Sequence, residues 1–289
     1  MHEIESVHPS IDLRKYVRAY AQRKTDIRGA PAIARVPARL EQVLEFQFGD
    51  AFDVLFDSGL RITTPQIAVI GPQTHLRASV SFCGRIESFG VFFQPSGFSQ
   101  IFGVPMRSLT NVGFDGTSIL GQRIRSIWNE LGETEELQNR VGIIERFLRQ
   151  IIARKPSFDR MMATTNRILS LQGQTCVAEL AHQERMGIRQ FERKFMEQVG
   201  TPPKVYARIA RFQTALDMKL AFVQMTWLDI SHALGYYDQM HLIHDFKSLG
   251  GGSPSRVLEH LIDMRPDAVT SSFGSEEKSS RVFTMHCAK

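Results

Sequence analysis

The stretch Glu179–Phe195, ELAHQERMGIRQFERKF, combines a few apolar side chains with many arginine, glutamine and glutamate side chains. Phe191 and Phe195 are four residues apart, so on a helix they share one buried face. The outward residues are then Ile188, Arg189, Gln190, Glu192 and Arg193. A guanidinium group can donate two hydrogen bonds to O6 and N7 of guanine, and a carboxylate can accept one from N4 of cytosine. This face therefore suits a nucleic-acid groove; the alternative is a solvated face with an internal Glu–Arg network.

A second polar group lies about fifty residues further on. It consists of Gln239, Met240, His241 and His244. A glutamine amide suits adenine in the major groove. The two histidines, three residues apart, are also typical of a metal pair, but two ligands on one helix without a third nearby make a poor zinc site. We therefore expect groove or phosphate contacts here, and neither a metal nor a cofactor.

The two groups belong to an internal repeat with a spacing of 51 residues. Its matching positions are Phe191 with Leu242, Phe195 with Phe246, Gly200 with Gly251, Pro203 with Pro254, and Tyr206 with Val257. Upstream the spacing is 50, and the single-residue difference falls in a turn, where insertions are tolerated. Each unit is thus a short helix, a tight turn and a second helix, which is helix-turn-helix geometry.

Helix boundaries follow from the flanking residues. Thr226 with Asp229 forms an acidic version of the capping box, and Asp238 is a good N-cap. Gly200 and Gly251 end the second helices, which we place at about 187–196 and 238–248. Between the units a longer helix covers residues 203–220. Its core face is Val205, Ile209, Phe212 and Leu216, and a basic face carries Lys204, Arg208, Arg211 and Lys219.

These segments resemble the C-terminal DNA-binding domain of the AraC/XylS family of bacterial transcription regulators. The matching segments are VAELAHQERMGIRQFERKFMEQVGTPPKVYARIARFQTAL and ISHALGYYDQMHLIHDFKSLGGGSPSRV. The resemblance implies that each second helix enters a major groove and that the linking helix holds the pair on successive grooves, about 34 Å apart. The implied DNA-binding residues are Arg189, Gln190, Glu192, Arg193, Lys204, Arg208, Gln239, Met240, His241 and His244.

The first turn departs from the family pattern. The family usually has Gly in this turn and Ser or Thr as the cap of the next helix, whereas this chain has Arg185 and Gly187. A residue other than glycine costs stability if the turn requires a positive φ. Val257 also replaces a usual aromatic residue.

The first third of the chain predicts short strands separated by turns, which is typical of a barrel or sandwich. The predicted strands are Leu44–Phe48, Phe52–Phe56, Gln66–Ile70 and Ile86–Phe93. By resemblance, with GPQTH and FGVFFQPSGFSQIFGVP as the matching stretches, this part is a β-rich, barrel-like (cupin-like) sensor domain. Its phenylalanines could line an apolar effector pocket or form plain core, and His75 could be a ligand contact or a surface histidine.

Helices are predicted at Ser118–Leu131 and Glu135–Ala153. In the second, Leu137, Val141, Ile144, Leu148 and Ile151 form a heptad-like seam. The seam could join two copies of the chain or pack against its own β domain. Arg154–Ser157 is the best linker candidate. The sequence thus predicts an α+β fold: residues 1–155, a sensor or dimerisation domain; residues 158–264, an all-α domain of two helix-turn-helix units; and residues 265–289, a polar tail that we expect to be disordered.

Composition sets wider limits. The net charge is +5 and the pI about 9.2, which permits an anionic partner. The charge is uneven: residues 185–219 hold eight Lys or Arg against three Asp or Glu, and residues 225–260 hold two against four. The three cysteines are far apart and predict a reducing compartment. We expect no secretory signal and no membrane span, and hence a cytoplasmic protein.

The favoured function is a sequence-specific DNA-binding transcription regulator without catalysis, controlled at its N-terminal domain by a small molecule or a partner. Contact with RNA polymerase and homodimerisation stay open. One alternative is an enzyme fused to the same module, as in alkyl-DNA repair, which needs an activated cysteine. Cys83 has only Arg85 nearby. The other is an interaction protein that has lost DNA binding, which the acidic second unit permits.

Overall fold

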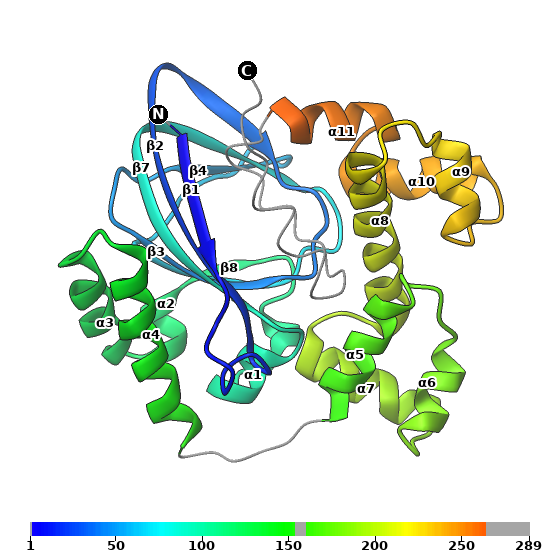
Figure 1. The fold of residues 1–289 in the computed structure, drawn as a ribbon, viewed down its shortest axis with the longest axis horizontal. Coiled ribbons are helices and arrows are strands. Elements are labelled where there is room, and N and C mark those ends of the chain that lie inside the picture. Colours follow the sequence, from blue (N-terminus) through cyan, green and yellow to red (C-terminus); the bar gives the residue numbers. More distant parts are fainter. Residues whose placement is uncertain (1, 154–159, 264–289) are drawn as a thin grey trace.

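A curved antiparallel sheet and a group of helices lie side by side in the computed structural model, which describes residues 2–153 and 160–263 (Figure 1). The predicted linker at 154–157 and the predicted tail at 265–289 lie outside the described residues. No helix among the described residues is long and apolar enough to cross a membrane.

The sheet is built on two long strands, β2 (Val17–Arg35) and β7 (Ala78–Phe93), which pair antiparallel. The strand order is β1-β2-β7-β3-β6-β8, and β4 pairs with β5 and β7. The remaining strands are β1 (His2–Val7), β3 (Gln42–Gln47), β4 (Asp53–Phe56), β5 (Arg61–Thr63), β6 (Ile67–Ile70) and β8 (Gly113–Asp115). Of the predicted strands, three correspond to β3, β4 and β6, and the fourth is the second half of β7. The α+β class is confirmed.

Helices cover one side of this sheet (Figure 1). They are α1 (Gly97–Phe102), the 3-10 turn η1 (Met106–Ser108), α2 (Gly116–Leu120), α3 (Arg123–Gly132) and α4 (Leu137–Ile152). The single helix predicted at Ser118–Leu131 is wrong, because the chain turns at Gly121, which has a φ of 78°.

Aromatic side chains fill the space between the sheet and these helices. The rings of Phe46 and Tyr20 each stack on Phe89, and Phe93 meets Phe98 edge to face at 5.3 Å. All five residues are almost fully buried. These phenylalanines are therefore packed core, which was one of the two predicted roles. His75 is exposed, as the surface interpretation predicts.

A buried arginine ties α4 to the two long strands. Arg140 is 1% exposed. It donates from Nη1 to Gln22 Oε1 at 2.7 Å and from Nη2 to Glu87 Oε1 at 2.8 Å, and its guanidinium lies over the Phe48 ring. Loss of one partner from such a buried pair costs about 3–5 kcal/mol, so the group fixes α4 firmly on the sheet.

The heptad-like seam of α4 faces this same core. Leu137, Val141, Ile144 and Leu148 are buried in it, and Ile151 packs against it. Ile143 and Phe147 are buried as well, so the apolar stripe is wider than a coiled-coil seam. The seam packs inside its own domain, the alternative that the sequence left open beside a dimer contact.

We expect Ile144→Ala to lower the free energy of unfolding by about 2–5 kcal/mol, because Ile144 is fully buried in this core. Urea denaturation measures the effect. Gln138→Ala, on the exposed side of the same helix, is the matched control and should stay within about 0.5 kcal/mol of the wild type. A stable Ile144→Ala variant with a changed oligomeric state in sedimentation would instead make the seam an interface between copies.

The C-terminal region is helical throughout. Its helices are α5 (Arg160–Ser170), α6 (Val177–Gln183), α7 (Ile188–Val199), α8 (Pro203–Ala221), α9 (Trp227–Ala233), α10 (Gln239–Gly250) and α11 (Pro254–Asp263). They share a second core, which also contains Ala38 and Leu40 from the β2–β3 connection. Figure 1 shows α8 running between the pair α6–α7 and the pair α9–α10.

Candidate nucleic-acid interface

Helix α7 buries one face and exposes the other. Phe191 and Phe195 are fully buried with ring centroids 5.7 Å apart, and Phe195 meets Tyr206 of α8 edge to face. The exposed residues are Ile188, Arg189, Gln190, Glu192 and Arg193. Within the described part of the chain, no hydrogen bond or ion pair engages the side chains of Arg189, Glu192 or Arg193. The internal Glu–Arg network that was the alternative interpretation is therefore not formed.

The turn before α7 carries the backbone strain that the sequence suggested. Arg185 has a φ of 55°, in the left-handed region, and its N–H donates to the carbonyl of His182. Gly235 takes the equivalent place in the second unit, with a φ of 65°. Gly187 is the N-cap of α7 and offers no side chain to its free N–H groups. The first unit therefore has a less favourable turn and cap than the second.

We expect Arg185→Gly to stabilise the protein by about 0.5–1 kcal/mol. A non-glycine residue in the left-handed region costs about 1–2 kcal/mol, and glycine removes this cost. The gain exceeds the loss that glycine causes by giving the unfolded chain more conformational entropy. Gly235→Ala is the reciprocal variant and should destabilise, because its Cβ would also lie 2.6 Å from Gln174 Oε1. Urea unfolding of both variants measures the difference. A destabilised Arg185→Gly variant would show that the Arg185 side chain contributes more than its backbone costs.

The second unit begins its helices as predicted. Thr226 and Asp229 form a reciprocal capping box at α9, and Asp238 Oδ1 accepts from the N–H of His241 at the start of α10. The predicted contact residues Gln239, Met240, His241 and His244 are all exposed. Among the described residues, no third His, Cys, Asp or Glu completes a metal-binding group with these histidines.

Helix α8 holds the two units together. Tyr206, Ile209, Phe212 and Leu216 are buried, and Phe212 meets Phe246 of α10 at 4.8 Å. Its basic side chains have different surroundings. Lys204 is exposed, whereas Arg208 Nε lies 2.5 Å from Oδ1 of the buried Asp245. Arg211 donates to the carbonyl of Gly173, and Lys219 donates to two carbonyls of the loop before α9.

The N-terminal domain contacts the carboxyl ends of both α7 and α10. Ser99 Oγ donates to the carbonyl of Gln198 at 3.1 Å, and Thr110 Oγ1 donates to that of Gly200. At α10, the Ala38 N–H donates to the carbonyl of Leu249 at 2.8 Å, and Arg35 Nη1 lies 3.4 Å from that of Gly251. We call these four interactions the carboxyl-end contacts. They leave the amino-terminal turns and outward faces of both helices uncovered by the sheet.

Sequence reasoning did not single out the N-terminal residues of the carboxyl-end contacts, Arg35, Ala38, Ser99 and Thr110. Ser99 lies within the stretch FGVFFQPSGFSQIFGVP that carries the sensor resemblance. The stronger signal is the repeated Gly200 and Gly251, because a glycine ending a helix also permits another backbone or side chain to approach closely. The partners themselves are more than 80 residues away in sequence, so no local pattern points to them.

A buried polar cluster lies between the β domain and α8. Glu41 is 2% exposed, and its Oε1 accepts from Gln213 Nε2 at 3.3 Å. Burial raises the pKa of Asp217 to about 7; the charge of Glu41 adds to the rise, and Arg18 opposes it. A carboxyl with a raised pKa binds more protons in the folded than in the unfolded chain, so stability falls as pH rises from the ordinary value of 3.8 to about 7.

We therefore expect Asp217→Asn to raise the thermal midpoint at about pH 8 and to have a much smaller effect at about pH 4, where the carboxyl is protonated in the folded state and only about half ionised in the unfolded state. Thermal unfolding across this range measures the difference. Asp229→Asn is the control, because capping hydrogen bonds from Thr226 lower the pKa of Asp229 and give it the opposite dependence. Equal effects of Asp217→Asn at both pH values would contradict a raised pKa.

Two parts of the chain match known protein families. Residues 180–260 match a family model described as a helix-turn-helix domain, and residues 5–115 match one described as a domain of unknown function (DUF6597). No curated protein matches the sequence. The helix-turn-helix match covers most of the repeat from which the units were predicted.

Solved structures of ToxT from Vibrio cholerae are among those to which this chain is similar. ToxT from strain O395 is 10% identical, with a TM-score of 0.47 over 84% of this chain and 98% of that chain. A second crystal form gives 10% identity and a TM-score of 0.46 over 90% and 98% of the two chains. Wild-type ToxT from strain SCE256, with an unsaturated fatty acid bound, gives 11% and 0.43 over 89% and 94%. At such identity the likeness implies no shared ligand or operator.

The repeat, the two exposed helix faces and the family match together define a DNA-binding transcription regulator. More narrowly, residues 180–260 form an AraC-type helix-turn-helix domain, which confirms the resemblance drawn from the sequence.

Proposed function

We propose that the protein reads a specific DNA sequence by placing α7 and α10 in two adjacent major grooves. The observation that supports this most is the exposed face of α7, where Arg189, Glu192 and Arg193 have no partner among the described residues. Polar groups held on a rigid helix without internal partners are free to bond to base edges. On α10, Gln239 suits adenine, and Met240, 65% exposed, suits the thymine methyl group.

In this proposal, α8 determines how far apart the two helices lie. Helix α8 has 19 residues and is therefore about 28 Å long. Successive major grooves on one face of B-DNA are about 34 Å apart. Phe195 of α7 contacts Tyr206 near the start of α8, and Phe246 of α10 contacts Phe212 in its middle, so α8 holds the two helices at different points along its length.

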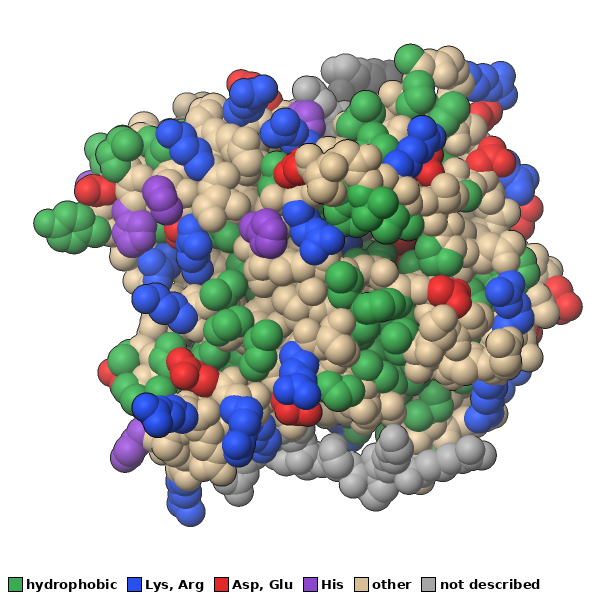
Figure 2. Space-filling view, turned by 180° about the vertical axis from the view of Figure 1, so that it is seen from behind, with side chains coloured by type: hydrophobic (Ala, Val, Ile, Leu, Met, Phe, Trp, Pro, Cys, Tyr) green, Lys and Arg blue, Asp and Glu red, His purple; other side chains and the backbone are tan. Residues whose placement is uncertain are grey.

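The two units have different electrostatic roles in this proposal. Phosphate neutralisation dominates the affinity for nucleic acid, and residues 185–219 carry a net charge of +5 against −2 for residues 225–260. The first unit and α8 supply the electrostatic attraction, while the second unit refines specificity or meets RNA polymerase. Figure 2 shows basic, acidic and histidine side chains interspersed on the helical side, so this surface is mixed and not a continuous basic patch.

Arg208 differs from Lys204 in its availability for a phosphate. Its ion pair with the buried Asp245 competes with a phosphate, whereas Lys204 is exposed and has no such partner among the described residues. In this proposal Lys204 contacts phosphate directly. Arg208 supports α10 and reaches phosphate only if the ion pair with Asp245 opens or is shared.

The N-terminal part acts in this proposal as the sensor, through a small molecule, a protein partner or a second copy of the chain. Its carboxyl-end contacts give it a direct connection to both reading helices. We also propose that the protein is cytoplasmic and that it divides into two domains, residues 1–155 and residues 158–264. Ala38 and Leu40 lie in the core of the helical part, so a fragment beginning at residue 158 would expose that surface.

We expect Arg189→Ala and Arg193→Ala each to cost about 1–3 kcal/mol of binding to the specific site and to relax discrimination at one base pair. Lys204→Ala should instead weaken binding to all DNA sequences alike. It should also lower the slope of log affinity against log salt concentration by roughly one unit. Glu192→Ala should raise non-specific affinity, because a negative charge is lost, while preference for cytosine at one position declines. Binding isotherms on specific and scrambled duplexes over a salt series separate these effects.

Arg146→Ala is the charge-matched control, because Arg146 is exposed on α4 of the N-terminal domain and its ion pair is with Glu130 of α3, not with either unit. An unchanged ratio of specific to scrambled affinity in both Arg189→Ala and Arg193→Ala would show that α7 does not read bases. Binding of no DNA at all, including the DNA upstream of its own gene, would favour the interaction protein. Methyl transfer that depends on Cys83, which is exposed on β7, would favour the repair enzyme.

A further inference from the structure

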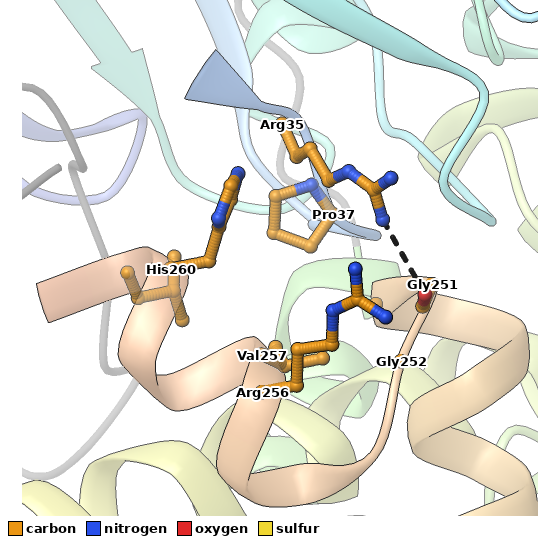
Figure 3. Close-up of a pocket in the computed structure, with 9 residues that line it drawn as sticks. Arg35, Pro37, Gly251, Gly252, Arg256, Val257 and His260 are labelled. Atoms are coloured by element: carbon orange, nitrogen blue, oxygen red, sulfur yellow. Dashed lines mark hydrogen bonds between the residues drawn. The ribbon is translucent and has the colours of Figure 1, made fainter. Parts of the chain in front are cut away.

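An open hollow of about 100 Å³ lies where the end of β2 meets the connection between α10 and α11 (Figure 3). One wall comes from the N-terminal domain and carries Arg35 and Pro37. The other wall is the backbone of Gly250–Gly252 and the first two turns of α11, with Arg256 and His260. The hollow therefore belongs to the junction of the two domains, and neither domain encloses it alone.

The polar side chains that face this hollow are all basic. Figure 3 shows the side chains of Arg35, Arg256 and His260 around the same space. Among the described lining residues there is no Asp or Glu. Neither arginine forms an ion pair with a described residue, and Nε2 of His260 is buried without a hydrogen-bond partner. Three basic side chains thus surround a space into which no described residue places a full negative charge.

Arg35 makes one weak contact there. Its Nη1 lies 3.4 Å from the carbonyl oxygen of Gly251, close to the upper limit for a hydrogen bond. The rest of its guanidinium fork stays available to an acceptor in the hollow. Arg256 packs its aliphatic stem near Gly252 and extends its head group toward the same side (Figure 3).

The remaining surface is apolar or bare backbone. Pro37, Val257 and Leu261 provide carbon atoms along the walls. Gly251 has a φ of 75°, and a Cβ there would lie 2.1 Å from Leu76 Cδ2, so this turn strongly favours glycine. The hollow thus combines a basic rim with a small apolar surface.

We propose that this hollow binds an oxyanion, either a carboxylate or a phosphate group, carried by a small and partly apolar molecule. Arginine forms paired, charge-assisted hydrogen bonds with both kinds of group. Because Arg35 and Arg256 come from different domains, the bound anion bridges them. A DNA phosphate is not the occupant, since the hollow lies at the carboxyl end of α10, opposite the turn that carries Gln239 and Met240. The site does not depend on the proposed base readers.

Isothermal titration of the full-length protein with inorganic phosphate and, separately, with butyrate tests the site at constant ionic strength. We expect saturable one-to-one binding of at least one probe, with a dissociation constant of about 1 mM or tighter. The two titrations distinguish a phosphate from a carboxylate ligand. Because neither involves DNA, the result is independent of whether the reading helices bind as proposed.

Arg35→Gln and Arg256→Gln should each weaken binding at least about tenfold, because each removes one charged partner. Both side chains are exposed, so the variants should keep the wild-type circular dichroism spectrum and thermal midpoint. Arg146→Gln carries the same charge change on α4, away from the hollow at α10 and α11 (Figure 1), and should bind like the wild type. Arg256→Lys, which keeps the charge but loses the fork, should fall between wild type and Arg256→Gln. Absence of saturable binding of both probes, or equal binding by wild type, Arg35→Gln and Arg256→Gln, would overturn the proposal.

Discussion

The packing of one helix, α8, decides whether this protein can present the exposed faces of α7 and α10, the proposed reading helices, at the same time. Tyr206 near its start packs on Phe195 of α7, and Phe212 packs on Phe246 of α10. Protein interiors are close-packed and deform little, so these aromatic contacts fix the positions of both helices along α8. The ion pair between Arg208 and Asp245 adds a polar connection to α10. The exposed groups of α7 and α10 depend on this helix for their separation and direction.

The N-terminal domain adds a second constraint at the other end of the same helices. The carboxyl-end contacts use backbone carbonyls that a helix leaves without internal partners, so they satisfy groups that would otherwise need water. The polar cluster of Glu41, Gln213 and Asp217 lies in the same junction, and so does the basic hollow formed by Arg35 and Arg256. A change in protonation or in an anion at the junction would therefore act on residues next to both reading helices.

The sequence predicted the helical half well because its signals are local. The paired Phe or Leu residues, the caps Thr226 and Asp238 and the terminal glycines act within a few residues of one another, and a 51-residue repeat showed them twice. Strand β2 was missed, because Gly29 and Pro31 lie next to a register shift between Ile27 and Ala32, and a break in alternation resembles a loop. The partner of Arg208, the packing direction of α4 and the basic hollow were not predictable, because each joins residues that only the folded chain brings together.

The carboxyl-end contacts have a kinetic consequence. A reading helix that is already held by a second domain loses little conformational freedom when it meets DNA, so less of the interaction energy is spent on ordering it. Such a rigid surface adapts poorly to a wrong sequence, because its side chains cannot move to find other partners. The charge of the protein governs the association rate with any duplex, whereas the complementarity of the contacts governs the dissociation rate. If α7 and α10 read DNA as proposed, discrimination between DNA sites resides chiefly in the residence time on DNA, and the junction between the domains is where that time is set.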